Sequence, residues 1–483
     1  MRINQSLTDI SHPGQDMHIA IVGGGIVGII LALGLTRQDI SVRVYEQAAG
    51  FREVGAGIAF SACARRCMEL VDPAITRALT RCGAVSVSDA DDESDYLRFI
   101  DGYNQHRPQD PSYQRPLAQI GCAGFRGCRR DQFLEELAKE IPPGVIVFGK
   151  RLMRIEENEN GGVALSFEDG TISDADAVIG CDGIKSRVRK HLFGTDHGAS
   201  YAQYTHKVAY RGLVRMDHAT EVLGAWKAGN FHHHVGPDAH LTHYPVANHT
   251  ALNVVVFLSD PDPWPVSDDS SMVAAGARDE VQAALKGWHP TVLGLVGLLP
   301  EKLSKWALFD LGDYPAPHYY DGRVCIAGDA AHSSSPHHGA GACLGVEDAL
   351  CLNLLLAHVR EKVAAKDSCG NGYPLGDALE AAFQTFDAVR RKRTQWLVNS
   401  SRRVCDLYHQ PEWADPKRWV KAETCFEEIR DRSYKIWHFD VDDMVQRTVV
   451  EYKARLEVRL RNGNVKTGDG AENGFGEEYG YVL

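Results

Sequence analysis

The alternation of apolar and polar residues predicts a strand, a glycine turn, a helix and a second strand near the start of the chain. Residues 18–22 form a short apolar run, and a glycine-rich turn at 23–28 follows it. The apolar character continues as a helix to about Arg37, and residues 41–45 predict the next strand. A strand, a crossover helix and a strand of this length form a β-α-β unit, which indicates a parallel sheet.

Later segments extend that sheet. The apolar pattern and the turn residues Glu-Asp-Gly predict a strand at 162–167, a turn at 168–170 and a buried strand at 175–180. Another buried strand is expected at 323–327, ahead of a helix at about 345–359. The parallel sheet is therefore expected to combine segments that lie far apart in the sequence.

A different pattern occupies the middle of the chain. Alternating strands such as 207–216 and 251–259 are typical of an antiparallel sheet with one face open to solvent or to a ligand. An amphipathic helix is expected at 130–141, and helices with bends run from 376 to about 460. The fold class is thus α/β, with a Rossmann-type domain, an inserted, mostly antiparallel sheet domain and C-terminal helices.

These patterns also predict the domain organisation. The nucleotide-binding domain is expected as three separate segments, interrupted by a loop or insertion and by a substrate domain. In chain order we expect a first nucleotide-binding segment 17–85, a loop or insertion 86–120, a second nucleotide-binding segment 121–190, the substrate domain 191–300, a third nucleotide-binding segment 301–385, C-terminal helices 386–460 and a disordered tail 461–483.

Composition narrows the function classes. The 483 residues are 44% apolar and carry a net charge of −12, which indicates a folded globular protein whose field disfavours nucleic acid and anionic lipid. The longest apolar run, 19–35, is shorter than the roughly 20 residues that a membrane span needs, so no span is expected. The twelve cysteines lack any CxxC pair, which favours reduced thiols and a cytoplasmic location.

Two polar clusters attract attention, and neither predicts a metal or a nucleic-acid site. His232-His233-His234 lacks a metal-ligand spacing, so a solvated loop is favoured and no metal is expected. The basic run 390–393 is interpreted as a solvated helix face or a domain contact.

The first glycine turn carries a dinucleotide fingerprint. Gly23, Gly25 and Gly28 match G-x-G-x-x-G between a strand and a helix, where backbone N–H groups can approach a pyrophosphate. Glu46 ends the second strand, where a carboxylate can accept hydrogen bonds from a ribose. This pattern alone leaves NAD and FAD undecided.

Two later motifs distinguish between them. Asp182-Gly183 follows one buried strand, and Gly328-Asp329 follows another. The GxGxxG, DG and GD motifs, in this order and separation, resemble those of the class A flavoprotein monooxygenases, the para-hydroxybenzoate and salicylate hydroxylase family. The resemblance spans about residues 17–400.

The resemblance implies FAD as cofactor and NADPH as co-substrate. It places Gly23, Gly25, Gly28 and Glu46 at the adenosine end, Asp329 at the ribityl chain, Ala342 near the ring edge, Arg130 at the phosphates and ribityl, and Asp182 and Gly183 beside both FAD and NADPH. Arg129 is the alternative to Arg130.

A closer likeness is to fungal monooxygenases that dearomatise phenolic polyketides on routes to tropolones, azaphilones and sorbicillinoids. Segments 50–57, 128–133, 209–213, 240–248 and 400–408 carry it. It implies that Arg211 and Tyr244 hold the substrate phenolate and that Phe125 helps to orient the ring. It also assigns Gly57 to the cofactor and His240 to the substrate.

The residues themselves leave alternatives at the two catalytic candidates. Arg211 shares a strand face with Ala209 and Leu213, so its charge needs a partner, either a phenolate or a carboxylate elsewhere in the fold. Tyr244 can equally be a core tyrosine whose hydroxyl is bonded by backbone.

The function implied is a monooxygenase in fungal secondary metabolism. NADPH reduces FAD, O2 adds as the C4a-hydroperoxide, and one oxygen enters an electron-rich phenolic polyketide, with dearomatisation where the attacked carbon carries an alkyl group. The alternatives are a flavin oxidase or dehydrogenase, and a non-catalytic binding protein like the GDP-dissociation inhibitors. The assembly state is open, with a homodimer among the options.

Overall fold

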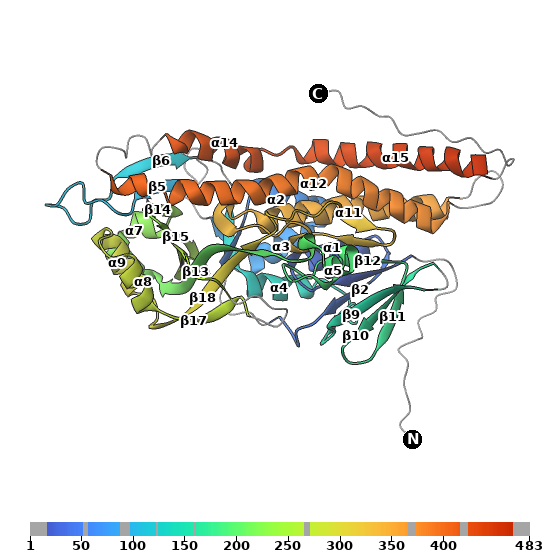
Figure 1. Cartoon of the computed structure of the whole chain (residues 1–483), viewed down its shortest axis with the longest axis horizontal. Helices are drawn as coiled ribbons and strands as arrows, with labels where there is room; N and C mark the ends of the chain where they lie inside the picture. The colour runs from blue at the N-terminus through green and yellow to red at the C-terminus, as the bar shows by residue number, and fades with distance from the viewer. Residues whose placement is uncertain are drawn as a thin grey trace, which may run out of the picture.

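Two sheets and a pair of long helices organise the molecule (Figure 1). The computed structural model describes residues 17–51, 57–86, 97–121, 124–158, 161–264, 271–365, 373–415 and 424–466. A parallel sheet lies towards one end and a larger, mostly antiparallel sheet towards the other, while α12 (Leu375–Tyr408) and α15 (Val441–Lys466) run along one side. The predicted α/β fold class is therefore confirmed. The tail beyond 466 lies outside the described residues.

The parallel sheet contains the predicted β-α-β unit. Its order is β19-β20-β12-β1-β2-β8. The strands are β1 (His18–Val22), β2 (Ser41–Glu46), β8 (Ile146–Phe148), β12 (Ala177–Gly180), β19 (Tyr320–Asp321) and β20 (Val324–Ile326), and helix α1 (Ile26–Arg37) joins β1 to β2. Strand β1 lies beside β12, and β12 lies beside β20, all in parallel. Their carboxyl ends therefore bring the GxGxxG, DG and GD motifs to one edge.

The second sheet has eight strands. Its order is β17-β18-β13-β16-β15-β14-β5-β6, and of these neighbours only β14 and β5 are parallel. The strands are β5 (Leu97–Asp101), β6 (Pro116–Ile120), β13 (Gln203–Arg215), β14 (His232–Gly236), β15 (Ala239–Val246), β16 (Ala251–Ser259), β17 (Val273–Ala277) and β18 (Lys302–Asp310). Its centre thus includes both antiparallel strands that the sequence predicts.

Two predicted boundaries differ from the structure. Within the stretch 86–120, expected as a loop or insertion, residues 97–101 and 116–120 form the edge strands β5 and β6, so a loop is the wrong prediction for these two segments. Strand β18 pairs with β13 although it lies beyond residue 300, the predicted end of the substrate domain. Short strands are fixed by distant partners that local periodicity does not register.

The two faces of the eight-stranded sheet have different neighbours. On one face, residues such as Val254 and Val256 pack in a core with α6 (Met216–Leu223), α8 (Arg278–Ala284) and α9 (Pro290–Gly297). Because strand side chains alternate, Val255 and Phe257 point to the opposite face. That second face is the one that lines the site described below.

The remaining elements connect and cover the sheets. Strands β3 (Gly57–Phe60), β4 (Val85–Ser86) and β7 (Arg126–Arg129) form a small sheet, and β9 (Leu152–Glu157), β10 (Val163–Phe167) and β11 (Ile172–Ala175) form another. The further helices are α2 (Ala62–Val71), α3 (Pro73–Arg81), α4 (Arg130–Ala138), α5 (Arg187–Phe193), α7 (Ala225–Ala228), α10 (Asp329–His332), α11 (Gly341–Ala364) and α14 (Cys425–Trp437).

Helix α11 is apolar over most of its length. Among the described helices it alone has the length and composition of a membrane-crossing segment, and 78% of its most apolar window is buried inside the protein. It packs against α1, α2, α12 and α15, so it forms part of the core.

A buried ionic network ties the GD turn to the long helices. On α11, Asp348 accepts hydrogen bonds from Arg390 Nε on α12 at 2.8 Å, from His332 Nε2 at 2.5 Å and from the Gly328 N–H at 3.0 Å. Arg390 also contacts Glu347 at 2.8 Å, and neither charged partner in the Asp348–Arg390 pair is exposed. Arg390, the first residue of the basic run, therefore makes a domain contact and is not on a solvated face.

We expect Asp348→Ala to destabilise the protein strongly. The substitution leaves Arg390, His332 and the Gly328 N–H without this buried acceptor, which costs about 3–5 kcal/mol. Urea unfolding measures the free energy. Asp431→Ala, at a surface pair with Arg430 where the aspartate side chain is 71% exposed, should change it by less than about 0.5 kcal/mol. Equal effects of the two substitutions would contradict the role assigned to Asp348.

Candidate active site

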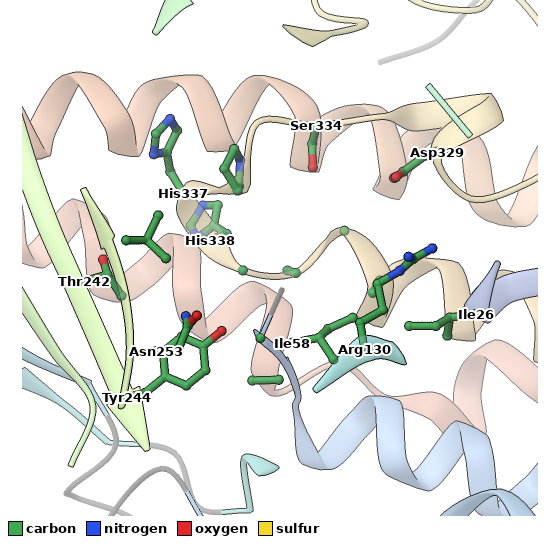
Figure 2. A pocket seen from close by; sticks show the side chains of 18 of the residues that line it. Ile26, Ile58, Arg130, Thr242, Tyr244, Asn253, Asp329, Ser334, His337 and His338 are labelled. Atoms are coloured by element: carbon green, nitrogen blue, oxygen red, sulfur yellow. The ribbon is translucent and has the colours of Figure 1, made fainter. Parts of the chain in front are cut away.

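A cavity of about 440 Å³ lies between the eight-stranded sheet and the motif edge of the parallel sheet. Figure 2 shows Thr242, Tyr244 and Asn253 on one side of it, with Arg130 and Asp329 on the other. The residues of the eight-stranded sheet that line it are Leu97, Arg211, His233, His240, Thr242, Tyr244, Asn253, Val255 and Phe257. The cavity therefore joins the two halves of the molecule.

Strand register explains why these side chains meet. Arg211 on β13 and Thr242 on β15 both pair with Val255 on β16, which lies between them, and Tyr244 pairs with Asn253. Residues directly opposite one another share a sheet face. The alternation along three strands thus places the guanidinium, the phenol and the amide on the cavity side.

Arg211 is a buried cation that lacks a counter-ion in the described part of the chain. It forms no ion pair with any described carboxylate, and its Nε is buried without a hydrogen-bond partner. The guanidinium carbon lies 5.2 Å from the centre of the Trp306 ring. Burial lowers the pKa of Arg211, while the nearby Tyr244 opposes this shift. The described residues therefore do not provide the carboxylate partner that the sequence left open.

Tyr244 points its hydroxyl at the start of β3. A Cβ built on Gly57 would lie 2.7 Å from Tyr244 Oη and 3.0 Å from Asn253 Cγ, so only glycine fits there. The Tyr244 ring packs edge-on against Phe231, with ring centres 5.5 Å apart. Burial raises the pKa of Tyr244, and Arg211 opposes that rise. The phenol therefore stays protonated and can donate.

A second cavity of about 460 Å³ adjoins the first. Both cavities are lined by Gly25, Arg130, Cys181 and Gly183. Glu46 belongs to the second cavity. A long ligand can therefore extend from the sheet edge to the face of the eight-stranded sheet.

The glycine turn leaves room for such a ligand. Gly23 has φ +106°, and a Cβ there would lie 2.3 Å from the carbonyl oxygen of Cys181. At Gly25, the N-cap of α1, an added Cβ would meet only Arg130 Nη2, at 3.9 Å, and no side chain caps the helix. The first N–H groups of α1 thus face open space, as pyrophosphate binding requires.

The arginine and carboxylate candidates have different local roles. Arg129 pairs with Asp131 at 2.6 Å, whereas Arg130 lines both cavities. Glu46 accepts hydrogen bonds from the Gly24 N–H at 2.7 Å and the Ala48 N–H at 2.8 Å, which fixes the carboxylate at the mouth of the turn.

The DG and GD aspartates also differ. Asp182 accepts from Ser186 Oγ at 2.5 Å and from the Arg187 N–H at 2.7 Å, so it holds the start of α5. Asp329 lines the first cavity, where burial raises its pKa and His332 and Arg130 oppose that rise. Asp329 is therefore the carboxylate that a ligand in the first cavity can reach, whereas Glu46 and Asp182 line the second.

The other predicted residues are not all at the cavity. Gly57, His240 and Ala342 line it. Phe125 is not in the lining; it packs edge-on against Trp437, which is, with ring centres 5.5 Å apart. Phe125 can therefore influence a substrate through Trp437.

The triple histidine is a buried strand, so the predicted solvated loop is wrong. His232, His233 and His234 all belong to β14 and are buried. Because successive side chains on a strand point to opposite faces of the sheet, His233 points into the cavity, where its Nδ1 lies 2.5 Å from Thr242 Oγ1. His234 faces the other side and contacts His243, with 3.1 Å between the Nε2 atoms. The polar residue types gave no sign of a strand, because these histidines are buried by neighbouring elements and not by an apolar pattern of their own.

Several lining residues escaped the sequence analysis. These are His233, Thr242, Asn253 and Trp437. Thr242 could have been found, since it alternates with Tyr244 on one strand, and Asn253 could have been found as a polar residue within an apolar run. The cavity positions of His233 and Trp437 depend on contacts between distant segments. His337 and His338, which follow the GD motif, also line the cavity.

The cavity histidines are neutral. Burial lowers the pKa of His233 and of His338 to about 3, and lowers that of His240 and His337 well below the usual value. No group of three potential metal ligands occurs among the described residues. These imidazoles therefore act as polar, uncharged walls around Arg211.

Comparisons with known proteins agree with this geometry. A family model for the FAD binding domain matches residues 127–369. The chain is 71% identical over 475 residues to salicylate hydroxylase asL1 of Sarocladium schorii, covering 98% of this chain and 97% of the relative. It is 69% identical over 446 residues to the FAD-dependent monooxygenase eupB of a Phoma species, covering 92% of this chain and 100% of the relative.

A solved structure shows the same fold. It is a salicylate hydroxylase in a substrate complex, with a TM-score of 0.73 and 26% identity, covering 90% of this chain and 98% of that one. The open helix N-terminus at Gly25, the two joined cavities and the cavity-facing Asp329 fit FAD, the cofactor that the family model supports.

Gly23→Ala should abolish FAD retention. The added methyl would overlap the Cys181 carbonyl oxygen and would require a left-handed backbone, so β1 and β12 must separate. The ratio of flavin to protein absorbance after purification measures retention. Gly50→Ala, where an added Cβ meets nothing within 4 Å, should keep the wild-type ratio. Normal flavin content in Gly23→Ala would contradict this packing.

Acid should destabilise the protein through its buried histidines. The unfolded imidazole has a pKa near 6.5, whereas folded His233 and His338 lie at about 3, so the unfolded chain binds more protons between these values. Each such histidine should cost about 1.4 kcal/mol of stability per pH unit below about 6.5. Melting temperature against pH measures this loss.

His233→Gln should flatten that dependence. His249→Asn, at an exposed position, should leave the slope unchanged. Identical slopes for His233→Gln and wild type would contradict the assignment.

Proposed function

The chain belongs to the FAD-dependent monooxygenases of the salicylate hydroxylase type that act in fungal secondary metabolism, and we propose that it hydroxylates a phenolic polyketide bound as its phenolate. NADPH is the proposed reductant and O2 the oxygen source. The observation that supports this most directly is Arg211, a cation in the cavity wall with no ion-pair partner among the described residues. Tyr244, on the same wall, provides a second donor.

The cofactor site follows from the joined cavities. We propose that Gly23 and Gly25 receive the pyrophosphate of FAD with Arg130, and that Glu46 lies at the adenosine end. Gly28 lies outside the two linings and would serve the turn itself, since an added Cβ there would lie 2.1 Å from the Gly23 carbonyl oxygen. Asp329 would bond the ribityl chain, and Ala342 would lie near the ring. When bound, FAD supplies the redox chemistry: it accepts hydride from NADPH and activates O2.

Arg211 and Tyr244 prepare the substrate. A guanidinium favours the ionised form of a phenol, and each unit by which it lowers the phenol pKa represents about 1.4 kcal/mol. Tyr244, whose own pKa is raised by burial, stays protonated and donates to the same oxygen. The phenolate ring is more electron-rich than the phenol, so its carbon is a better nucleophile.

The cavity walls orient the ring and exclude water. Apolar surface comes from Phe231, Phe257, Tyr408 and Trp437, and the neighbouring histidines stay neutral. Exclusion of water strengthens the interaction between Arg211 and the phenolate. Where the attacked carbon carries an alkyl group it has no proton to lose, and the product is dearomatised.

We also propose a cytoplasmic location, on the basis of the thiols. The ten described cysteines are all free, which supports the proposal of a reducing, cytoplasmic environment.

Wild-type protein should couple NADPH oxidation to hydroxylated product with a phenolic polyketide aldehyde, and Arg211→Met should lose this activity. Loss of the guanidinium should cost about 2–5 kcal/mol, or about thirtyfold or more in kcat/KM. The apparent pKa of the bound phenol should rise, as read from the pH at which the bound ligand ionises. Product mass and NADPH absorbance measure turnover.

Lys305→Met is the matched control. This cation, on neighbouring β18, pairs with Asp260 at 3.1 Å and lies outside the cavity lining, so turnover should remain near wild type. Full turnover in Arg211→Met would overturn the phenolate clamp. Hydrogen peroxide formed stoichiometrically with an oxidised product would instead identify an oxidase.

A further inference from the structure

Asn253 is a polar residue in an apolar strand. Its neighbours from 252 to 258 are all leucine, valine or phenylalanine, and they fill the centre of the eight-stranded sheet. The Asn253 residue is only 2% exposed and lines the cavity. No described group forms a hydrogen bond with its side-chain amide. Since buried polar groups are almost always hydrogen-bonded, this amide is available for a cavity ligand.

The amide and the Tyr244 hydroxyl converge on one place. A Cβ built on Gly57 would lie 3.2 Å from Asn253 Nδ2 and 2.7 Å from Tyr244 Oη. The two residues are direct partners across β15 and β16, and Figure 2 shows both side chains at the same wall of the cavity. A ring oxygen held by Tyr244 therefore places the adjoining region of the ring near the Asn253 amide.

Other polar groups on this wall already form hydrogen bonds, although His240 Nε2 is buried without a partner. Thr242 Oγ1 lies 2.5 Å from His233 Nδ1, and His240 Nδ1 lies 2.7 Å from His409 Nε2. Across the cavity, His338 Nε2 lies 3.0 Å from Ser400 Oγ. In the Asn253 amide, by contrast, both the N–H donor and the carbonyl acceptor remain available for a ligand.

The three polar side chains differ in what they can bind. The Arg211 guanidinium only donates and carries a positive charge, so it selects a negative oxygen, to which the protonated Tyr244 hydroxyl can also donate. An amide both donates and accepts, so it can bind a neutral hydroxyl or a carbonyl. Asn253 is thus suited to an uncharged oxygen on the same ring.

We propose that Asn253 binds a second oxygen substituent of the substrate ring, so that the site selects aromatic rings with two oxygens over simple phenols. This inference rests on the proposed function, in which Arg211 and Tyr244 bind the first oxygen as phenolate. Asn253 then determines how the ring is rotated about that oxygen, and hence which carbon faces the cofactor.

The test compares two ligands that differ by one hydroxyl, 4-ethylresorcinol and 4-ethylphenol. Their dissociation constants are measured without NADPH on the FAD-loaded protein, from the change in flavin absorbance. Asn253→Leu should weaken binding of 4-ethylresorcinol by about tenfold or more and should change binding of 4-ethylphenol by less than about twofold. Asn253→Thr, which keeps a hydroxyl in a strand-compatible side chain, should retain some of the selectivity.

The outcomes separate the two proposals. Equal weakening of both ligands by Asn253→Leu, or no change in either, would overturn the role of Asn253. Arg211→Met should weaken both ligands, and its failure to do so would overturn the phenolate clamp while leaving the Asn253 comparison readable. Flavin content and melting temperature identify any variant that fails to fold, in which case Asn253→Thr decides the question through its ligand ratio.

Discussion

The electrostatic constraint at the centre of this molecule is a largely desolvated guanidinium, that of Arg211, held in the cavity wall without a described counter-charge. Burial of a charge opposes folding, and a carboxylate beside Arg211 would relieve that cost. Such a carboxylate would also occupy the guanidinium and remove its attraction for an anionic ligand. Strand β13 is bonded on both sides, by β16 and β18, so the backbone at Arg211 cannot move outward to solvate it. The sheet thus holds the Arg211 guanidinium in an unfavourable position, and an anionic ligand in the cavity can neutralise its charge.

The same sheet supplies the stability that this arrangement needs. One face packs with α6, α8 and α9 in an apolar core, and the other carries the cavity residues. Because side chains alternate, each strand contributes to both faces without any change of backbone. The histidines on the cavity face remain neutral, since burial lowers their pKa values, and so they do not add repulsion around Arg211.

Local signals made the nucleotide half predictable, while contacts between distant segments limited the rest. The glycine turn at Gly23 and the strand face of Arg211 follow from short-range rules of backbone and alternation. The strands at 97–101 and 116–120 do not, because their partners fix them. His232–234 is polar in sequence and buried in structure for the same reason. Asn253 was detectable as a polar residue within an apolar run, but only the folded structure shows that its side-chain amide has no described hydrogen-bond partner.

The junction between the two cavities separates the groups that would position the cofactor from the groups that would select the substrate. Gly25, Cys181 and Gly183 come from turns that follow β1 and β12, and these two turns pack tightly at Gly23, where an added Cβ would lie 2.3 Å from the Cys181 carbonyl oxygen. A cofactor that spans both cavities is therefore positioned mainly by backbone. The groups that would contact a substrate are side chains on β13, β15 and β16, which can be exchanged without altering that backbone. Substitutions on this sheet face should therefore change which ring is accepted and how it is oriented, while the cofactor position stays fixed.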